Sequence, residues 1–179
     1  MSIQPRYTVK YVQSAVEKAL RRTGAERPTI LRANERAVVA RFAIHLARIV
    51  EVQGRGLTVD VEYSRVGADF NPKRVRGAQI FPDLIVHRRS KPDGNLFAAE
   101  FKMGRLIPLA KRNRPCWYDA ERIEELTRVG PTSDDASPYL VGACVTLFED
   151  HADVWWFHQG ERGAHQEITF DEAGDDGPA

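Results

Sequence analysis

Hydrophobic residues recur along the chain with two periods, which together predict a domain of helices and strands. Apolar positions every three or four residues predict helices over 8–24, 34–54 and 119–129. Alternating or continuous apolar residues between turn formers predict strands over 57–63, 79–89, 96–103, 139–148, 154–157 and 167–170. This order of elements predicts an α/β fold (α+β, with a mixed sheet).

Short polar residues mark the starts of two predicted helices. Asn34 is suited to cap the second helix, and Asp119 is suited to cap the third. Glu35, in the first turn of the second helix, either complements the helix N-terminus or reaches a functional site. The third helix carries charged residues on its solvent side, so we expect it to be a scaffold and not part of a site.

The size and composition of the chain are those of one globular domain. With 179 residues, of which 42% are hydrophobic, residues 1–170 are expected to form a single domain. The acidic, turn-rich tail 171–179 is expected to be flexible. An apolar run of about 20 residues and a signal-peptide core are both absent, which predicts a cytoplasmic protein with no membrane partner.

Charged side chains interrupt two neighbouring strands that would otherwise be buried. Strands 79–89 and 96–103 are joined by turn-forming residues, so we expect an antiparallel pair. Because side chains alternate between the two faces of a strand, Glu100 and Lys102 lie on one face of the second strand. Asp83 projects from the first strand. Burying these charges is costly unless they pair with each other or bind an ion.

Two interpretations of these charges follow. Asp83 and Glu100 offer the hard oxygen ligands that Mg²⁺ prefers, with Mn²⁺ as a substitute. Lys102 would orient or help to deprotonate a metal-bound water, or neutralise charge on a phosphate. Alternatively, Lys102 forms a structural salt bridge with Asp83 or Glu100.

The pattern resembles a known family. Pro82-Asp83 followed by Glu100-x-Lys102 resembles the signature of the PD-(D/E)xK nuclease superfamily. The chain is also similar to small, stand-alone, largely uncharacterised bacterial members of that superfamily, over about 34–156. The similar stretches are 34–36, 59–65, 81–89 and 95–102.

The resemblance implies a fold and an activity. The fold would be a restriction-endonuclease-like core of helix, strand, strand, strand, helix and strand, preceded here by an extra N-terminal helix. The activity would be that of a Mg²⁺-dependent endodeoxyribonuclease, a phosphodiester hydrolase. The resemblance implies a metal bound by Asp83, Glu100 and the main-chain carbonyl of Phe101, with Lys102 as a catalytic residue. Glu35 or Glu62 would be the accessory acid.

The charge distribution adds weak support for a nucleic-acid partner. The net charge is only +1, but residues 65–114 hold 12 basic and 4 acidic side chains. Such a basic block suits a phosphate backbone, and equally a solvated loop region. The candidate DNA contacts are Arg65, Lys73, Arg74, Arg76 and Arg105.

Several questions stay open at this level. RNA remains a possible partner besides DNA, and a homodimer would suit cutting of both strands of a duplex. The competing function is a non-catalytic module that binds nucleic acid or protein, because a fold does not imply an activity. Nucleotide-driven chemistry is not expected, since the sequence has no Gly-Lys-Ser/Thr phosphate loop.

Overall fold

The computed structural model describes residues 7–26, 32–51, 56–62, 65–66, 71–72, 74–75, 78–79, 81–88, 94–107, 117–129 and 138–170. The described elements are α1 (Val9–Ala25), α2 (Glu35–Glu51), β1 (Thr58–Val61), β2 (Arg65–Val66), β3 (Asn71–Pro72), β4 (Arg74–Val75), β5 (Ala78–Gln79), β6 (Leu84–His87), β7 (Asn95–Met103), the 3₁₀ turn η2 (Gly104–Leu106), α3 (Trp117–Thr127), β8 (Val141–Leu147), β9 (His151–His158) and β10 (Glu161–Thr169). The predicted tail 171–179 lies outside the described residues.

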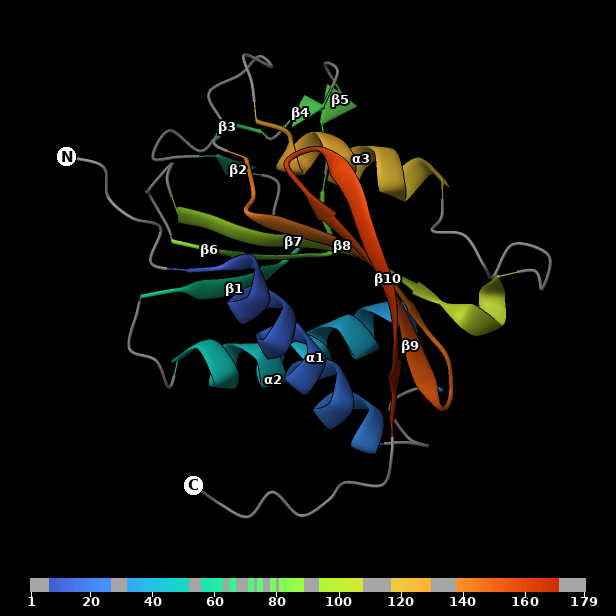
Figure 1. Ribbon diagram of the computed structural model, residues 1–179. Coiled ribbons are helices and arrows are strands. Elements are labelled where there is room, and N and C mark those ends of the chain that lie inside the picture. Colours follow the sequence, from blue (N-terminus) through green and yellow to red (C-terminus); the bar gives the residue numbers. More distant parts are fainter. Residues whose placement is uncertain are drawn as a thin grey trace.

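Six of the strands form one mixed sheet, which confirms the α/β class. Their order is β1-β6-β7-β8-β9-β10, and only β7 and β8 pair in parallel. The parallel pair requires a crossover, and α3 lies within it. Helices α1 and α2 lie on one face of the sheet and α3 lies on the other (Figure 1). The predicted antiparallel pairing of the two motif strands is confirmed in β6 and β7.

The starts of the first two helices agree with the sequence. The Thr8 hydroxyl accepts a hydrogen bond from the N–H of Tyr11, and the Asn34 side chain accepts one from the N–H of Ala37. Beyond α1, the Glu26 carboxylate contacts Arg41 and His45 of α2, which joins the two helices. The predicted cap of α3 is wrong, because the helix begins at Trp117 and Asp119 lies within its first turn.

Some predicted strand ends also differ. The first strand was expected to continue through Glu62, but β1 ends at Val61 and Glu62 has a positive φ of 51°. The chain turns out of the sheet there, and the Glu62 N–H donates to the Asp83 carbonyl at 3.0 Å. Asp83 itself precedes β6, which begins at Leu84. Strands β9 and β10 are longer than predicted, and the short ribbons β2–β3 and β4–β5 were not predicted.

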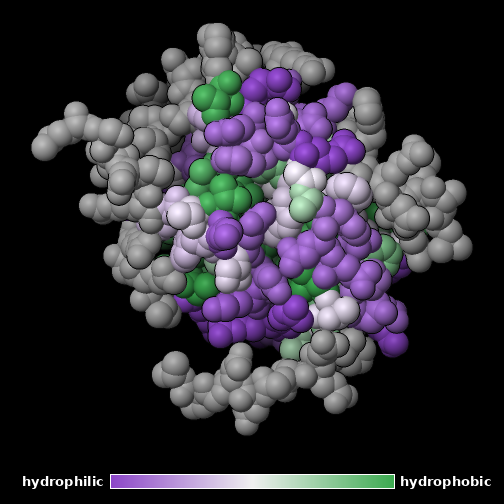
Figure 2. Space-filling view, in the orientation of Figure 1, coloured by the Kyte–Doolittle hydropathy of each residue, from purple (hydrophilic) through white to green (hydrophobic). Residues whose placement is uncertain are grey.

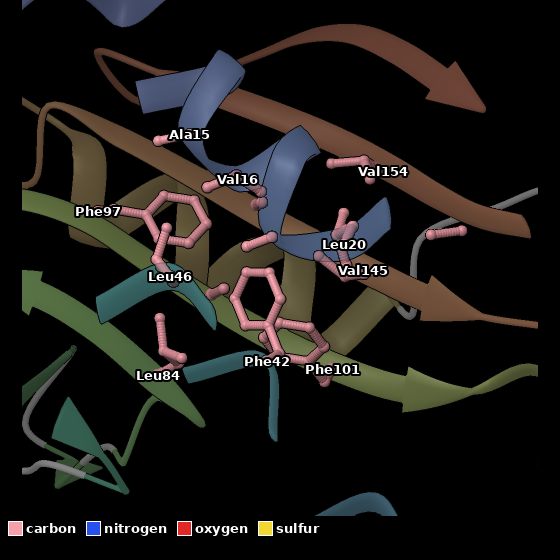
Figure 3. Close-up of a cluster of buried hydrophobic side chains, with 14 of the residues drawn as sticks. Ala15, Val16, Leu20, Phe42, Leu46, Leu84, Phe97, Phe101, Val145 and Val154 are labelled. Atoms are coloured by element: carbon pink, nitrogen blue, oxygen red, sulfur yellow. The ribbon is translucent and has the colours of Figure 1, made fainter. Parts of the chain in front are cut away.

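The larger core fills the space between the sheet and the two N-terminal helices (Figure 3). Phe42 of α2 and Phe101 of β7 are fully buried, with ring centroids 5.1 Å apart. Leu20 of α1 lies in the same cluster. Burial of each such side chain stabilises the fold by about 1.5–3 kcal/mol. Because α2 packs here, its N-terminus is held beside the end of β7 where the charged residues lie.

A smaller core on the opposite face fixes α3 against the sheet. Ile123 of α3 packs there with Ile85, Ala98 and other residues. Gly142 of β8 permits this close approach, since a Cβ atom at that position would lie 2.3 Å from a methyl group of Ile123. The adjacent tryptophans of β9 point to opposite faces of the sheet: Trp156 packs in the larger core and Trp155 against the smaller one.

Figure 2 shows one face of the molecule, on which hydrophobic side chains appear in separate small areas among hydrophilic ones. No helix among the described residues combines the length and apolar character needed to cross a bilayer.

Candidate active site

Three predicted site residues come together where β6 begins and β7 ends. Glu100 and Lys102 project from β7 on the face covered by α3, the face to which Ala98 also belongs. Asp83 lies just before β6, and its Oδ2 accepts a hydrogen bond of 2.7 Å from the N–H of Phe101. This bond holds the Asp83 carboxylate against β7, next to Glu100.

Glu100 is the buried carboxyl group of the site, with only 5% of its surface exposed. Burial, followed by the negative charges of Asp83 and Asp119, raises the pKa of Glu100 to about 8, while Lys102 opposes the rise. Glu100 is therefore uncharged over much of the neutral range when no cation is present. A cation beside Glu100 and Asp83 would favour the ionised form of both groups.

The Lys102 ammonium has three oxygen neighbours from three elements. Nζ donates to the carbonyl oxygen of Phe101 at 2.8 Å and lies 3.6 Å from Oε1 of Glu35. Its third neighbour is Oδ2 of Asp119 on α3, at 3.8 Å. Within the described residues, Lys102 forms no ion pair with Asp83 or Glu100.

The charge state of Lys102 follows from these neighbours. Burial alone would lower the pKa of Lys102, but the negative charges of the surrounding acids outweigh burial and raise it above its usual value. The largest of these contributions comes from Asp119, followed by Glu35. Lys102 therefore acts as a permanent cation at neutral pH, and a role as a general base does not fit this environment.

Asp119 is the site residue that sequence reasoning missed. Helix α3 was expected to be a scaffold only, but Asp119 is 7% exposed and turned toward the site. One signal was present in the sequence, since Asp119 precedes the inner-face residue Ile123 by four positions. Residues four apart share a helix face, so this acid had to lie on the sheet side of α3.

The two accessory acids occupy different places. Glu35 contacts Lys102, as the interpretation of a helix acid reaching the site requires. Glu62 forms an ion pair of 3.0 Å with Nε of Arg36, and both side chains are more than half exposed. Of the two acids, Glu35 is the one in contact with the Lys102 ammonium.

A cleft opens beside these residues. Its volume is about 360 Å³, and it is lined by Glu35, Arg36, Val39, Ala40, Val61, Glu62 and Asp83. It thus reaches Asp83 from the side of α2 and β1. Its walls combine three carboxylates, one arginine and small apolar side chains, a lining suited to a hydrated cation together with a phosphate group.

The predicted nucleic-acid contacts are only partly described. Arg105 uses its guanidinium within the protein, donating to the carbonyls of Arg32 at 3.0 Å and Ala33 at 2.6 Å. It thereby ties η2 to the start of α2, close to Glu35. The side chains of Arg65 and Arg74, and all of Lys73 and Arg76, lie outside the described residues, so their role stays a prediction.

A second set of possible metal ligands lies elsewhere. Among the described residues, only His151, Asp153 and Glu167 form a group of three whose ligand atoms all lie within 4.8 Å of one another. The carboxyl groups near Lys102 are more widely spread. They fit Mg²⁺ nevertheless, because this ion usually takes one or two protein carboxylates and keeps several waters.

Comparisons with known proteins found no similarity: no protein-family model matches the chain, and no curated protein or solved structure does so.

Proposed function

We propose that this chain is a divalent-metal-dependent nuclease that hydrolyses DNA phosphodiester bonds, on a restriction-endonuclease-like core. The order α2, β1, β6, β7, α3, β8 supports this proposal, since it follows the order that the resemblance implies, with α1 as the extra helix. Glu35 supports it further, as an acid from the first helix of that core lying 3.6 Å from Lys102.

The observation that carries the proposal is the pair formed by Asp83 and Glu100. The half-buried Asp83 carboxyl group, just before β6, lies beside the buried Glu100 carboxyl group of β7, and the nearby ammonium is ion-paired with other acids. Such a pair destabilises the fold when both members are ionised. A divalent cation removes that penalty, which gives a physical reason for the arrangement.

The chain's residues then have distinct tasks. Asp83 and Glu100 would hold the cation, and the Phe101 carbonyl has a second lone pair besides the one that faces Lys102. When bound, Mg²⁺ would supply Lewis-acid stabilisation of charge on the phosphate. Lys102, held as a cation, would orient the attacking water by hydrogen bonding and stabilise the negative charge that grows on the phosphate oxygens.

Substrate would approach through the cleft next to Asp83. Arg36 lies at this cleft with 86% of its side chain exposed, where it can meet a phosphate of the DNA backbone. Hydrolysis would add water across one P–O bond, leaving a phosphomonoester on one product and a hydroxyl group on the other.

The test is cleavage of labelled duplex, branched and single-stranded DNA in Mg²⁺ or Mn²⁺. Wild type is compared with Asp83→Asn and Lys102→Ala, purified identically, and with Glu121→Gln as an acid-to-amide control on the far side of α3. We expect cleavage by wild type and the control, and a loss of about a hundredfold or more in the two site variants.

The outcomes separate the two functions considered. Binding of DNA by wild type without cleavage in either metal would favour the non-catalytic binding module. Site variants as active as wild type would refute the assignment of the site. An RNA substrate in the same assay would show which nucleic acid is preferred.

A further inference from the structure

The proposed function leaves one buried charge unexplained, the carboxylate of Asp119. Only 10% of the Asp119 side chain is exposed to solvent. Oδ2 is fully buried and accepts no hydrogen bond from any described group. Oδ1 lies 3.9 Å from a guanidinium nitrogen of Arg122, one turn further along α3. A buried carboxylate with so little hydrogen bonding destabilises the fold unless a nearby charge compensates it.

The position of Asp119 in the first turn of α3 does not by itself explain why its side chain is buried. Acids in a first turn do interact favourably with the helix dipole, but an exposed acid gains that interaction without being desolvated. Asp119 instead turns inward, and its unbonded oxygen lies 3.8 Å from Nζ of Lys102. Lys102 therefore supplies the compensating charge at this oxygen, while Arg122 lies beside the other one.

We propose that Asp119 is a positioning residue that holds the Lys102 ammonium for the reaction; this inference rests on the proposed nuclease function. Nζ of Lys102 donates one hydrogen bond, to the Phe101 carbonyl, and lies within ion-pair distance of Glu35 and Asp119. These three residues belong to β7, α2 and α3. Helices from opposite faces of the sheet thus fix one atom between them.

The contacts of Nζ with Glu35 and Asp119, called the clamp from here on, also affect the pair formed by Asp83 and Glu100. With Nζ held by Glu35 and Asp119, Lys102 forms no ion pair with Asp83 or Glu100 within the described residues, and that pair stays available for a cation. Asp119 is not a member of the pair itself. Among the described residues, Asp119 forms no group with Asp83 and Glu100 whose ligand atoms all lie within 4.8 Å. Asp119 therefore acts through Lys102 and not as a ligand.

The first arm of the test uses Asp119→Asn, which keeps the shape of the side chain and removes its charge. At saturating Mg²⁺ we expect kcat for DNA cleavage to fall by about 10- to 100-fold, the usual effect of losing an outer positioning group. KM for DNA and the affinity for Mn²⁺, measured by calorimetry, should stay within about twofold of wild type. Asp119→Glu should recover part of kcat, and Glu121→Gln should match wild type.

The second arm needs no catalytic activity. Metal-free protein is acetylated briefly, and the modification of each lysine is measured by mass spectrometry. Lys102 should react about three to five times faster in Asp119→Asn than in wild type, since acetylation takes place on the free amine and the loss of a partly buried ion pair makes that amine more available. Exposed Lys10 and Lys18 of α1 serve as internal references and should not change.

The two arms distinguish failure of this inference from failure of the proposed function. Unchanged labelling of Lys102 in Asp119→Asn would overturn the clamp. A large loss of Mn²⁺ affinity would also overturn it, because Asp119 would then behave as a ligand. If wild type cuts no DNA while Lys102 still reacts faster in the variant, the nuclease proposal fails and the clamp stands.

Discussion

Replacing Glu100 by glutamine should stabilise the metal-free protein, and the gain should grow with pH. The pKa of Glu100 is raised from 4.5 to about 8 by burial and by neighbouring acids. Between these two values the folded chain holds one proton more than the unfolded chain. The free energy of unfolding therefore falls as pH rises through this window. Above pH 8, where Glu100 is ionised in the folded chain too, the free energy of unfolding falls no further on its account.

The size of the effect follows from the same two values. At 1.36 kcal/mol per pH unit, a rise from 4.5 to about 8 corresponds to about 5 kcal/mol of unfolding free energy. Glutamine resembles the neutral acid, so Glu100→Gln should equal wild type in stability near pH 4.5. At pH 8.5 the variant should be the more stable protein by up to about 5 kcal/mol.

Urea unfolding followed by tryptophan fluorescence, in buffer with a chelator and at several pH values, measures this difference. The unfolding free energy of Glu121→Gln should change with pH in the same way as that of wild type. Adding Mg²⁺ at about 100 times its dissociation constant should stabilise wild type at pH 8 by about 2.7 kcal/mol and stabilise Glu100→Gln much less. A stability difference between Glu100→Gln and wild type that does not change with pH would refute the assigned environment of Glu100.

Two further predictions concern the supports of the site. Arg105→Ala should lower the unfolding free energy by about 1 kcal/mol, since two hydrogen bonds to carbonyls at the start of α2 are lost, and Arg105→Lys should not restore both; urea unfolding checks this. Gly142→Ala should destabilise by about 1–3 kcal/mol because its Cβ would meet Ile123 at 2.3 Å, whereas Gly163→Ala, with its nearest contact at 3.5 Å, should be close to neutral in thermal unfolding.

Much of the fold was predictable because its elements carry strong local signals. The Asn34 cap and the helical spacing of residues such as Phe42 predicted α2, and the continuous apolar run over 139–148 predicted β8, whose residues are all buried. The ribbons β2–β3 and β4–β5 each pair only two residues per strand. Such strands are too short for an alternating hydrophobic pattern to be recognised in the sequence. The end of β1 depended on a long-range hydrogen bond from Glu62 to Asp83, which no local pattern encodes.

The site was predictable to a smaller extent. Asp83, Glu100 and Lys102 were found because charged residues in apolar strands need a physical reason, and Glu35 because the resemblance implies an acid from the first helix of the core. Asp119 also lies in a first turn, but it was interpreted as the N-cap of a helix that serves only as a scaffold. Only the packing of α3, fixed by Ile123 over Gly142, brings Asp119 to Lys102.

The partners of Lys102 separate the two interpretations of the charged strand residues. A structural salt bridge would place the ammonium between Asp83 and Glu100, where it would favour ionisation of both. Instead, Lys102 is ion-paired with Glu35 and Asp119, and the pKa of Glu100 is raised to about 8. Four carboxyl groups thus surround one lysine, and this excess of acids, together with burial, raises the pKa of Glu100. A divalent cation would remove that excess, whereas a purely structural role for the pair would be served better by apolar residues.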